Sequence, residues 1–289
     1  LQTQASFVMA RTTTLNADGG TFEIDPATNL TNSGVVSGNG QLTKTGNGGL
    51  LLSGNNTYTG ATQVDAGTLQ AGSDTAFGDN SAVMLADVAG ATLDVNGFDV
   101  SIGSLAGGGA AGGNVTLGIG SLTTGGNNTN TTFGGTITGT GEFRKTGSGT
   151  MSMTADNSAF GGTTFVEGGT LSVNGQLCGD MNVLTGGRLE GTGTVCDTAN
   201  SGVIAPGNSI GTLLVIGNYV GGGNLEIEAE LGDDGFPADR LLITGNVTGV
   251  TDVDVINLGG AGAATGFGPT DGASVIQVGG TSTAGAFQL

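Results

Sequence analysis

Apolar and polar residues alternate along many short stretches of this chain. Leu50 and Leu52 occupy every second position of one stretch, and Thr62 and Val64 do so in the next. A period of two is typical of β-strands with one buried face, and no ten-residue stretch has the 3.6-residue period of a helix. Glycines and the pair Asn55 and Asn56 interrupt the stretches every few residues, which ends each strand in a turn. The pattern predicts an all-β protein of short strands.

A long segment occurs twice in the chain. Gly40–Leu69 aligns almost without gaps with Gly141–Leu171. The matched positions include both lysines and several glycines and apolar residues: Lys44 with Lys145, Gly46 with Gly147, Gly48 with Gly149, Leu50 and Leu52 with Met151 and Met153, and Gly60 with Gly161. An internal repeat of this length indicates a repeating architecture in which each unit packs on its neighbour.

A shorter Thr-Leu signature indicates the length of one structural coil. Leu69 and Leu93 are 24 residues apart, and Leu171 and Leu213 are 42 residues apart, or twice 21. Short strands and tight turns that recur about every 20 residues are typical of a solenoid. We therefore predict a β-solenoid in which leucines at this step stack into an internal ladder.

Composition and charge narrow the class of protein. The 289 residues include 61 glycines, yet the alternating apolar positions argue against disorder. The formal net charge of −18 opposes binding to nucleic acid and to anionic membranes. No run of 18 apolar residues is present, and the start at Leu1 lacks the pattern of a signal peptide, so we expect an excised or mature fragment.

The repeated segment resembles the β-strand repeat of autotransporter passenger domains, the exported parts of bacterial type V secretion proteins. The end of the chain carries a second resemblance, to the C-terminal part of these passengers. There a turn motif precedes an acidic amphipathic strand, NLEIEAEL at 224–231, and a strand of the pattern D-x-L-x-I-x-G. The matching residues are Pro206, Gly207, Asn208, Ser209, Ile210, Gly211, Asp239, Leu241, Ile243 and Gly245. The stretch 272–289 resembles the last strands of the passenger.

The resemblance implies a fold, a location and partners. It implies a right-handed parallel β-helix forming a single elongated rod, with a stem at 1–200, repeats at 38–72 and 139–175, and an autochaperone-like end at 201–289. It implies export through the periplasm and outer membrane to the cell surface or the medium. The partners would be a host-cell receptor or matrix, sister passengers, and the protein's own C-terminal membrane β-barrel, which lies outside this chain.

Cys178 and Cys196 are 18 residues apart, close to the length of one coil. Stacked positions on adjacent coils lie about 5 Å apart, which is within the Cα range of a disulfide. We expect a disulfide between them, and the alternative is two unrelated buried thiols. Two cysteines without a histidine make a poor metal site.

Two segments are candidates for binding. Residues 106–136 are rich in Gly, Asn and Thr, and we interpret them as loops that leave the solenoid around a short strand at Val115–Ile119. Such loops are either binding elements or tolerated insertions. Glu226, Glu228 and Glu230 share one face of a predicted strand. With Asp233, Asp234 and Asp239 they could hold a cation, but parallel side chains are more typical of a solvated face that prevents edge pairing.

Catalytic groups are scarce. Ser209 lies in a G-x-S-x-G pattern, but the chain has no histidine to act as its base. Lys44 and Lys145 occupy equivalent repeat positions, for which we expect a role on the coil surface. Carboxylates such as Asp94 and Asp99 could serve a polysaccharide-active β-helix enzyme, although few aromatic residues are available to stack on sugars.

We therefore expect a non-enzymatic adhesin or virulence factor with no catalytic residue, cofactor or metal. The alternatives are a released ligand that acts on a host receptor and, third, a polysaccharide-active enzyme.

Overall fold

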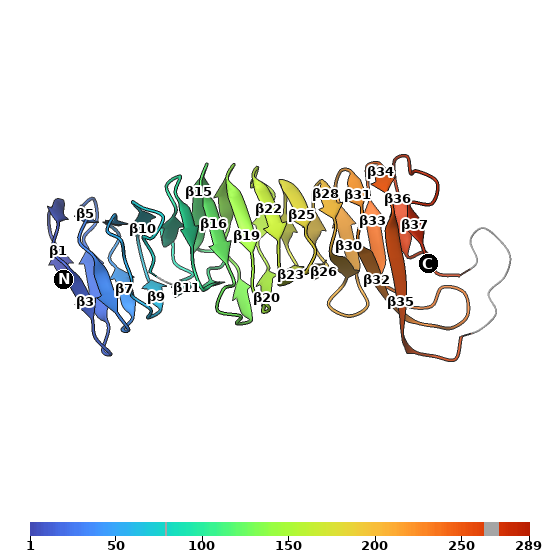
Figure 1. Ribbon diagram of the computed structural model, residues 1–289, viewed down its shortest axis with the longest axis horizontal. Coiled ribbons are helices and arrows are strands. Elements are labelled where there is room, and N and C mark those ends of the chain that lie inside the picture. The colour runs from blue at the N-terminus through green and yellow to red at the C-terminus, as the bar shows by residue number, and fades with distance from the viewer. Residues whose placement is uncertain (79, 263–271) are drawn as a thin grey trace. The chain divides into compact units, whose positions relative to one another are not determined.

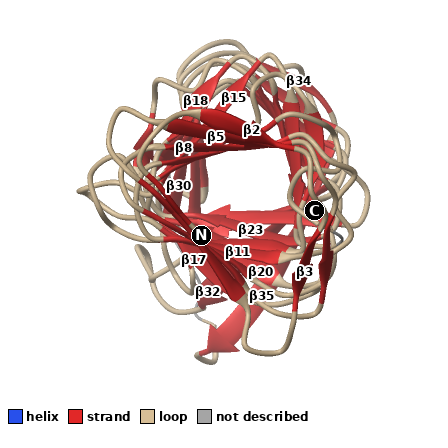
Figure 2. Ribbon diagram, turned by 90° about the vertical axis from the view of Figure 1, so that its left-hand side faces the viewer, coloured by secondary structure: helices blue, strands red, loops and turns tan. Residues whose placement is uncertain are grey.

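The computed structural model describes residues 1–78, 80–262 and 272–289. In this part of the chain the regular elements are β-strands, and none of it forms a helix long and apolar enough to cross a membrane. The chain divides into two compact units, Leu1–Thr163 and Thr164–Leu289. Each unit is a parallel β-solenoid, because strands from successive coils pair side by side and run in the same direction (Figures 1 and 2). The predicted all-β solenoid is confirmed.

The first unit has two long sheets. The β4 sheet consists of β1 (Gln2–Thr3), β4 (Gly20–Ile24), β7 (Leu42–Thr45), β9 (Thr62–Val64), β11 (Ala82–Leu85), β14 (Ser104–Gly107), β17 (Thr131–Phe133) and β20 (Thr150–Met153). The β5 sheet consists of β2 (Phe7–Met9), β5 (Asn29–Asn32), β8 (Gly49–Leu52), β10 (Thr68–Ala71), β12 (Thr92–Asp94), β15 (Asn114–Gly118) and β18 (Ile137–Gly139).

The third face of this unit is less continuous. The pair β3 (Thr13–Leu15) and β6 (Val36–Gly38) begins it, and the β16 sheet continues it with β13 (Asp99–Ser101), β16 (Ser121–Thr124) and β19 (Glu142–Lys145). Two short strands follow near the boundary of the units, β21 (Asp156–Asn157) and β22 (Thr163–Val166).

The described strands of the second unit lie in three sheets. The β23 sheet consists of β23 (Gly169–Val173), β26 (Gly187–Gly191), β29 (Val203–Pro206), β32 (Asn224–Glu230), β35 (Thr251–Gly259) and β37 (Phe287–Gln288). The β24 sheet consists of β24 (Gln176–Leu177), β27 (Thr194–Val195), β30 (Thr212–Val215), β33 (Arg240–Ile243) and β36 (Ile276–Val278). The β25 sheet consists of β25 (Asp180–Val183), β28 (Thr198–Asn200), β31 (Tyr219–Gly221) and β34 (Val247–Gly249).

A leucine ladder runs through the core of the first unit. The register pairs Leu30 with Leu50, Leu50 with Leu69, and Leu69 with Leu93, and all four side chains are fully buried. Alternation along each strand sends the intervening residues outward. Burial of the apolar ladder is the main favourable contribution to stacking of the coils, at about 25 cal/mol per Å² of apolar surface. The predicted ladder is confirmed for Leu69 and Leu93.

The same prediction is wrong for Leu171 and Leu213. Leu171 pairs with Leu189, which pairs with Ile204, all in the β23 sheet. Leu213 lies in the β24 sheet and pairs with Leu241. The first coils of the second unit are shorter than the predicted 21 residues. The position two predicted coil lengths after Leu171 therefore falls on a strand of another face.

The interpretation of residues 106–136 as loops that leave the solenoid is also wrong. Strands β15, β16 and β17 lie within this segment and pair with strands of the neighbouring coils. Leu117, Leu122 and Phe133 are fully buried. Glycine and asparagine lower the apparent strand propensity of the segment, but its inward positions keep their apolar side chains. The segment is therefore a regular part of the solenoid wall.

The first strands of the two repeat copies lie on different faces of the first unit. Lys44 lies in β7 of the β4 sheet, whereas the matching Lys145 is the last residue of β19 in the β16 sheet. The next strands of the two copies also lie in different sheets: β8 belongs to the β5 sheet, and β20 belongs to the β4 sheet. The conformation of the repeat is therefore set by contacts with the adjacent coils and not by one particular face.

Candidate functional site

The predicted motif at 206–211 forms a turn at the end of β29. Gly191 and Gly207 exchange two backbone hydrogen bonds of 2.8 Å, which fix the start of the turn against the preceding coil. Gly207 has a φ of 94°, and a Cβ atom there would lie 1.9 Å from the carbonyl oxygen of Ser209. Only glycine fits this position without displacing the turn.

Asp239 closes the turn from the following coil. Its Oδ1 accepts a hydrogen bond of 2.8 Å from the backbone N–H of Gly211, and its Oδ2 accepts one of 2.8 Å from that of Glu228. The backbone N–H of Asp239 itself donates to the carbonyl oxygen of Glu228. The side chain is only 1% exposed. One buried carboxylate therefore joins the turn, strand β32 and the start of β33.

Burial raises the pKa of Asp239 above its ordinary value. The two backbone hydrogen bonds and the positive charge of Arg188 act in the opposite direction, because they favour the ionised carboxylate. Arg188 also forms ion pairs with Glu190 and Glu226 on the outer face of the β23 sheet. The buried carboxylate of Asp239 therefore lies beside the charged side chains of Arg188, Glu190 and Glu226.

The other predicted motif residues align neighbouring coils. Leu241 and Ile243 point into the core and are in register with Leu213 and Val215. Gly245 lies so close to the previous coil that a Cβ atom would be 2.3 Å from the carbonyl oxygen of Gly217. The sequence identified these residues, but it did not indicate that Asp239 contacts Gly211.

Asn208 extends the turn in the other direction along the solenoid. Its side-chain oxygen accepts a hydrogen bond of 3.0 Å from Ser172, and its side-chain nitrogen donates one of 2.7 Å to Asn174. Pro206 is buried, Ile210 is half-buried, and Ser209 is exposed at the tip of the turn. Asn208 therefore reaches the coil of β23, two strands before β29 in the β23 sheet.

The acidic side chains of β32 and the residues after it do not converge on a site for an ion. Glu226 pairs with Arg188, and Asp239 binds backbone N–H groups on the inside. Among the residues that the structure describes, no three His, Cys, Asp or Glu side chains are arranged to hold a metal ion. Of the two carboxylates considered for sugar chemistry, Asp94 accepts a hydrogen bond from Gln70, and Asp99 accepts one from the backbone of Ser121.

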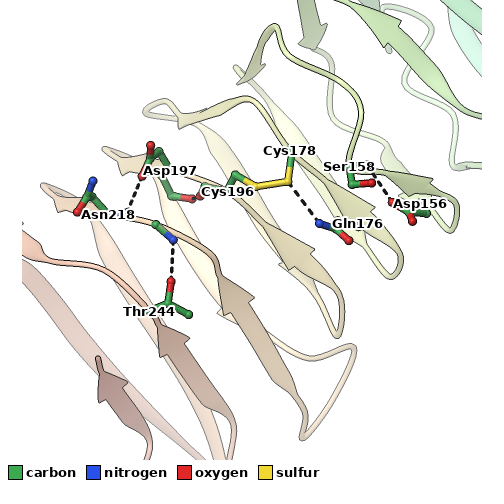
Figure 3. The surroundings of a disulfide bond; sticks show 10 residues. Asp156, Ser158, Gln176, Cys178, Cys196, Asp197, Asn218 and Thr244 are labelled. Carbon is green, nitrogen blue, oxygen red and sulfur yellow. Dashed lines mark hydrogen bonds between the residues drawn. A yellow bond between two sulfur atoms is a disulfide. The ribbon is translucent and has the colours of Figure 1, made fainter. Parts of the chain in front are cut away.

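Cys178 and Cys196 lie directly after β24 and β27, whose register pairs Leu177 with Val195. The next pair of positions therefore brings the cysteines together, with their Cα atoms 4.7 Å apart and their sulfur atoms bonded (Figure 3). The side-chain amide of Gln176 donates to the sulfur of Cys178. The bond spans two adjacent coils, and its oxidation in the purified, unreduced protein stays a prediction.

The repeat contains buried polar groups that connect coils. The ammonium group of Lys44 donates to the carbonyl oxygens of Thr45, Gly46 and Ala66 at 2.7–3.0 Å. Lys145 makes the same contacts to Thr146 and Gly147. Both lysines are fully buried, so their predicted place on the coil surface is wrong. The long aliphatic stem packs in the core, while the ammonium group reaches the carbonyl groups of the turn.

Asn56 and Asn157 are the second pair of matched polar residues. The side-chain oxygen of Asn56 accepts a hydrogen bond from the backbone N–H of Val36, and its nitrogen donates to the carbonyl oxygen of Ala76. The side-chain oxygen of Asn157 likewise accepts from the N–H of Ile137. Both side chains are buried, so each asparagine satisfies backbone groups that would otherwise have no partner.

Two family models match parts of the chain. The model described as Autochaperone Domain Type 1 matches residues 192–289. The model described as Passenger-associated-transport-repeat matches residues 42–71 and 143–173. The first therefore includes the turn and Asp239, and the second includes the buried lysines and asparagines of both repeats.

Several curated proteins are also similar in sequence to the chain. The Adhesin BmaC autotransporter of Brucella suis biovar 1 (strain 1330) is 40% identical over 256 residues, which cover 88% of this chain and 7% of that protein. The Uncharacterized protein YuaQ of Escherichia coli (strain K12) is 39% identical over 45% of the chain and 10% of its own length. The Extracellular serine protease of Serratia marcescens is 33% identical over 40% of the chain and 12% of its own length. The chain thus spans only a small part of each of these relatives.

Proposed function

The chain is part of the passenger of a bacterial autotransporter, exported through the outer membrane to the cell surface or the medium, and on this basis we propose that it is a non-enzymatic adhesive segment whose end promotes folding of the passenger. The adhesive role would belong to the solenoid wall of residues 1–200, and the folding role to residues 201–289. Its binding partners would be a host-cell receptor or matrix, or sister passengers.

The adhesive role is supported by the similarity to the BmaC autotransporter, which its name describes as an adhesin and which matches 88% of this chain. The match covers only 7% of that protein, so adhesion by this particular segment is part of the proposal. The similarity to a serine protease covers a smaller part of this chain. The chain contains no histidine to act as the base of a serine nucleophile, and Lys44 and Lys145 are buried with their ammonium groups bound to backbone carbonyl oxygens.

The folding role is supported by one observation above all, the position of Asp239. Its carboxylate can bind Gly211 and Glu228 only when three successive segments of the second unit are in place. Completion of this contact would convert the C-terminal coils into a rigid end on which further coils can stack. A solenoid gains stability mainly from neighbouring repeats, so one preformed coil lowers the cost of adding the next.

A cell-binding assay tests the adhesive role. Beads coated with the whole chain should bind cultured host cells, or aggregate with one another, more than beads coated with an unrelated acidic protein of similar net charge. The second candidate, a released ligand, is favoured if the free chain triggers receptor phosphorylation at concentrations at which coated beads do not adhere. Absence of both cell binding and bead aggregation would contradict an adhesive role for this segment.

A further inference from the structure

A hollow in the outer surface of the first unit lies over four successive strands, β5, β8, β10 and β12, which stack as neighbours in the β5 sheet. The register places two outward-facing rows beside one another. One row runs through Asn29, Gly49 and Thr68, and the other through Thr31, Leu51, Gln70 and Asp94.

Gly49 lies in the first row and in the lining of the hollow. Gly49 has no side chain, and a Cβ atom there would lie 2.4 Å from the side-chain oxygen of Asn29, so the amide of Asn29 lies over Gly49 at the edge of the hollow. Asn47 and Ala27 form a wall at the adjacent corner. Four strands spaced by about 4.8 Å give the hollow a length of about 14 Å along the stack.

The lining combines neutral hydrogen-bonding groups with a small apolar centre. Asn29, Asn47 and Thr31 offer amide and hydroxyl groups that both donate and accept hydrogen bonds. Leu51 supplies the apolar surface between them. The single carboxylate in the lining, Asp94, already accepts hydrogen bonds from the side chain of Gln70 and the backbone of Asn96.

These properties discriminate between ligand classes. The net charge of −18 opposes an anionic ligand. A cationic ligand would find one carboxylate, Asp94, whose two oxygens already accept hydrogen bonds from Gln70 and Asn96. A purely apolar ligand would leave the amide and hydroxyl groups without partners, which costs free energy. A neutral sugar has hydroxyl groups around its rim and apolar C–H groups on its face, and so it matches the lining.

We propose that this hollow, centred on Leu51 and bordered by Asn29, Asn47 and Thr31, binds short neutral oligosaccharides. The inference rests on the proposed adhesive function and gives it a ligand class. Because no aromatic ring lines the hollow, a single site would bind weakly. Adhesion would then depend on many copies of the passenger that engage a glycan-coated surface together.

The test uses the whole labelled chain on a densely printed array of neutral, sialylated and sulfated oligosaccharides. We expect binding to neutral glycans, with apparent affinity reduced at least tenfold in Asn29→Ala/Asn47→Ala. Thr31→Gln, which fills the hollow from β5, should have the same effect. Asn55→Ala, at an exposed corner, and Thr43→Gln, on the outer face of β7, are matched controls that should bind as the parent does. Thermal unfolding of each variant confirms that the fold is retained.

Three results would overturn the inference: binding confined to charged glycans, full binding by both hollow variants, or recognition of a protein receptor with no glycan signal. The proposed function has a separate readout. If coated beads adhere to cells but no neutral glycan is bound, the glycan site is wrong and adhesion stands. If the beads neither adhere nor aggregate, the adhesive function itself is wrong.

Discussion

The carboxylate of Asp239 accepts a hydrogen bond from the backbone N–H of Gly211, a residue 28 positions earlier in the chain. The same carboxylate binds the backbone of Glu228 with its second oxygen. The contact explains why a glycine-rich turn and a distant aspartate occur together in the C-terminal unit. The glycine at position 207 lets the turn approach the carboxylate, since a Cβ atom there would lie 3.0 Å from Oδ1 of Asp239.

Replacement of this aspartate should destabilise the C-terminal unit. In Asp239→Asn one oxygen is replaced by an NH₂ group, so an N–H donor faces another N–H donor inside the protein. A buried donor without a partner costs about 1–3 kcal/mol, and we expect a loss of that size in the free energy of unfolding. Urea unfolding followed by circular dichroism measures it. Asp233→Asn, at an exposed site nearby, is the control, and equal stability of the two variants would contradict the role of Asp239.

The buried asparagine of the repeat gives a second prediction. Asn56→Ala leaves the N–H of Val36 and the carbonyl oxygen of Ala76 without their partners, so we expect a loss of about 2–4 kcal/mol. The adjacent Asn55 is exposed, and Asn55→Ala should change the free energy of unfolding by less than about 0.5 kcal/mol. Chemical denaturation of both variants compares their free energies of unfolding directly. If they are equally stable, Asn56 does not connect the coils as described.

The repeat also shows what the sequence could and could not predict. Alternation of Leu50 and Leu52 was sufficient to predict strands, and the match of Lys44 with Lys145 was sufficient to predict equivalent surroundings. The alignment did not show that the lysines are buried, because a lysine is buried only where backbone carbonyl oxygens converge, and this depends on the turn of the adjacent coil. Nor did it show that the copies occupy different sheets, because the face reached by a strand depends on the lengths of all coils between the copies.

The candidate site was predictable to a similar degree. The resemblance identified Pro206–Gly211 and Asp239 as separate motif elements. Their contact could not be derived, because it requires the register of β32 and β33 with the preceding coil. The hollow over the β5 sheet was not predicted at all. It depends on Gly49 and Asn29 lying opposite each other across two strands, and only the paired structure shows this.

Titration of the buried lysines and tyrosines should give a stability maximum near pH 10. Burial lowers the pKa of Lys44 from 10.5 to about 8, and it lowers that of Lys145 as well. Between about pH 8 and 10.5 the unfolded chain therefore binds more protons than the folded chain, and the free energy of unfolding rises with pH. Burial raises the pKa of Tyr58 and Tyr219 above 10.0. Above that pH the folded chain keeps phenolic protons that the unfolded chain loses, so stability falls again.

Urea midpoints measured from pH 7 to pH 11 test this profile. In Lys44→Met/Lys145→Met the rise between pH 8 and 10 should disappear, because neither side chain titrates. Tyr58→Phe should weaken the decline above pH 10. A rise that persists unchanged in the double lysine variant would mean that other groups cause it.

The disulfide gives a further prediction. Cys178 and Cys196 should be oxidised in the exported protein, because the compartments that it crosses favour disulfides. A titration of the unfolded, unreduced protein should find no free thiol. Closing a loop across a sequence separation of 18 residues stabilises the fold by about 3 kcal/mol in the chain-entropy account. Cys178→Ser/Cys196→Ser should unfold at a correspondingly lower urea concentration, and detection of two free thiols in the parent would refute the assignment.

The last prediction concerns the order in which the coils form. We propose that residues 201–289 are the most protected part of the chain in native-state hydrogen exchange and that the other coils add onto them. In Leu225→Asp/Ile227→Asp two carboxylates replace fully buried side chains of β32. Because an unpaired buried charge costs several kcal/mol, the C-terminal unit should not form, and exchange protection should be lost along the whole chain. Ile216→Asp/Val220→Asp places two carboxylates at exposed positions of the same unit and should keep native protection. If the β32 variant keeps native protection upstream of residue 200, the N-terminal coils fold without the C-terminal unit and the proposed folding role is wrong.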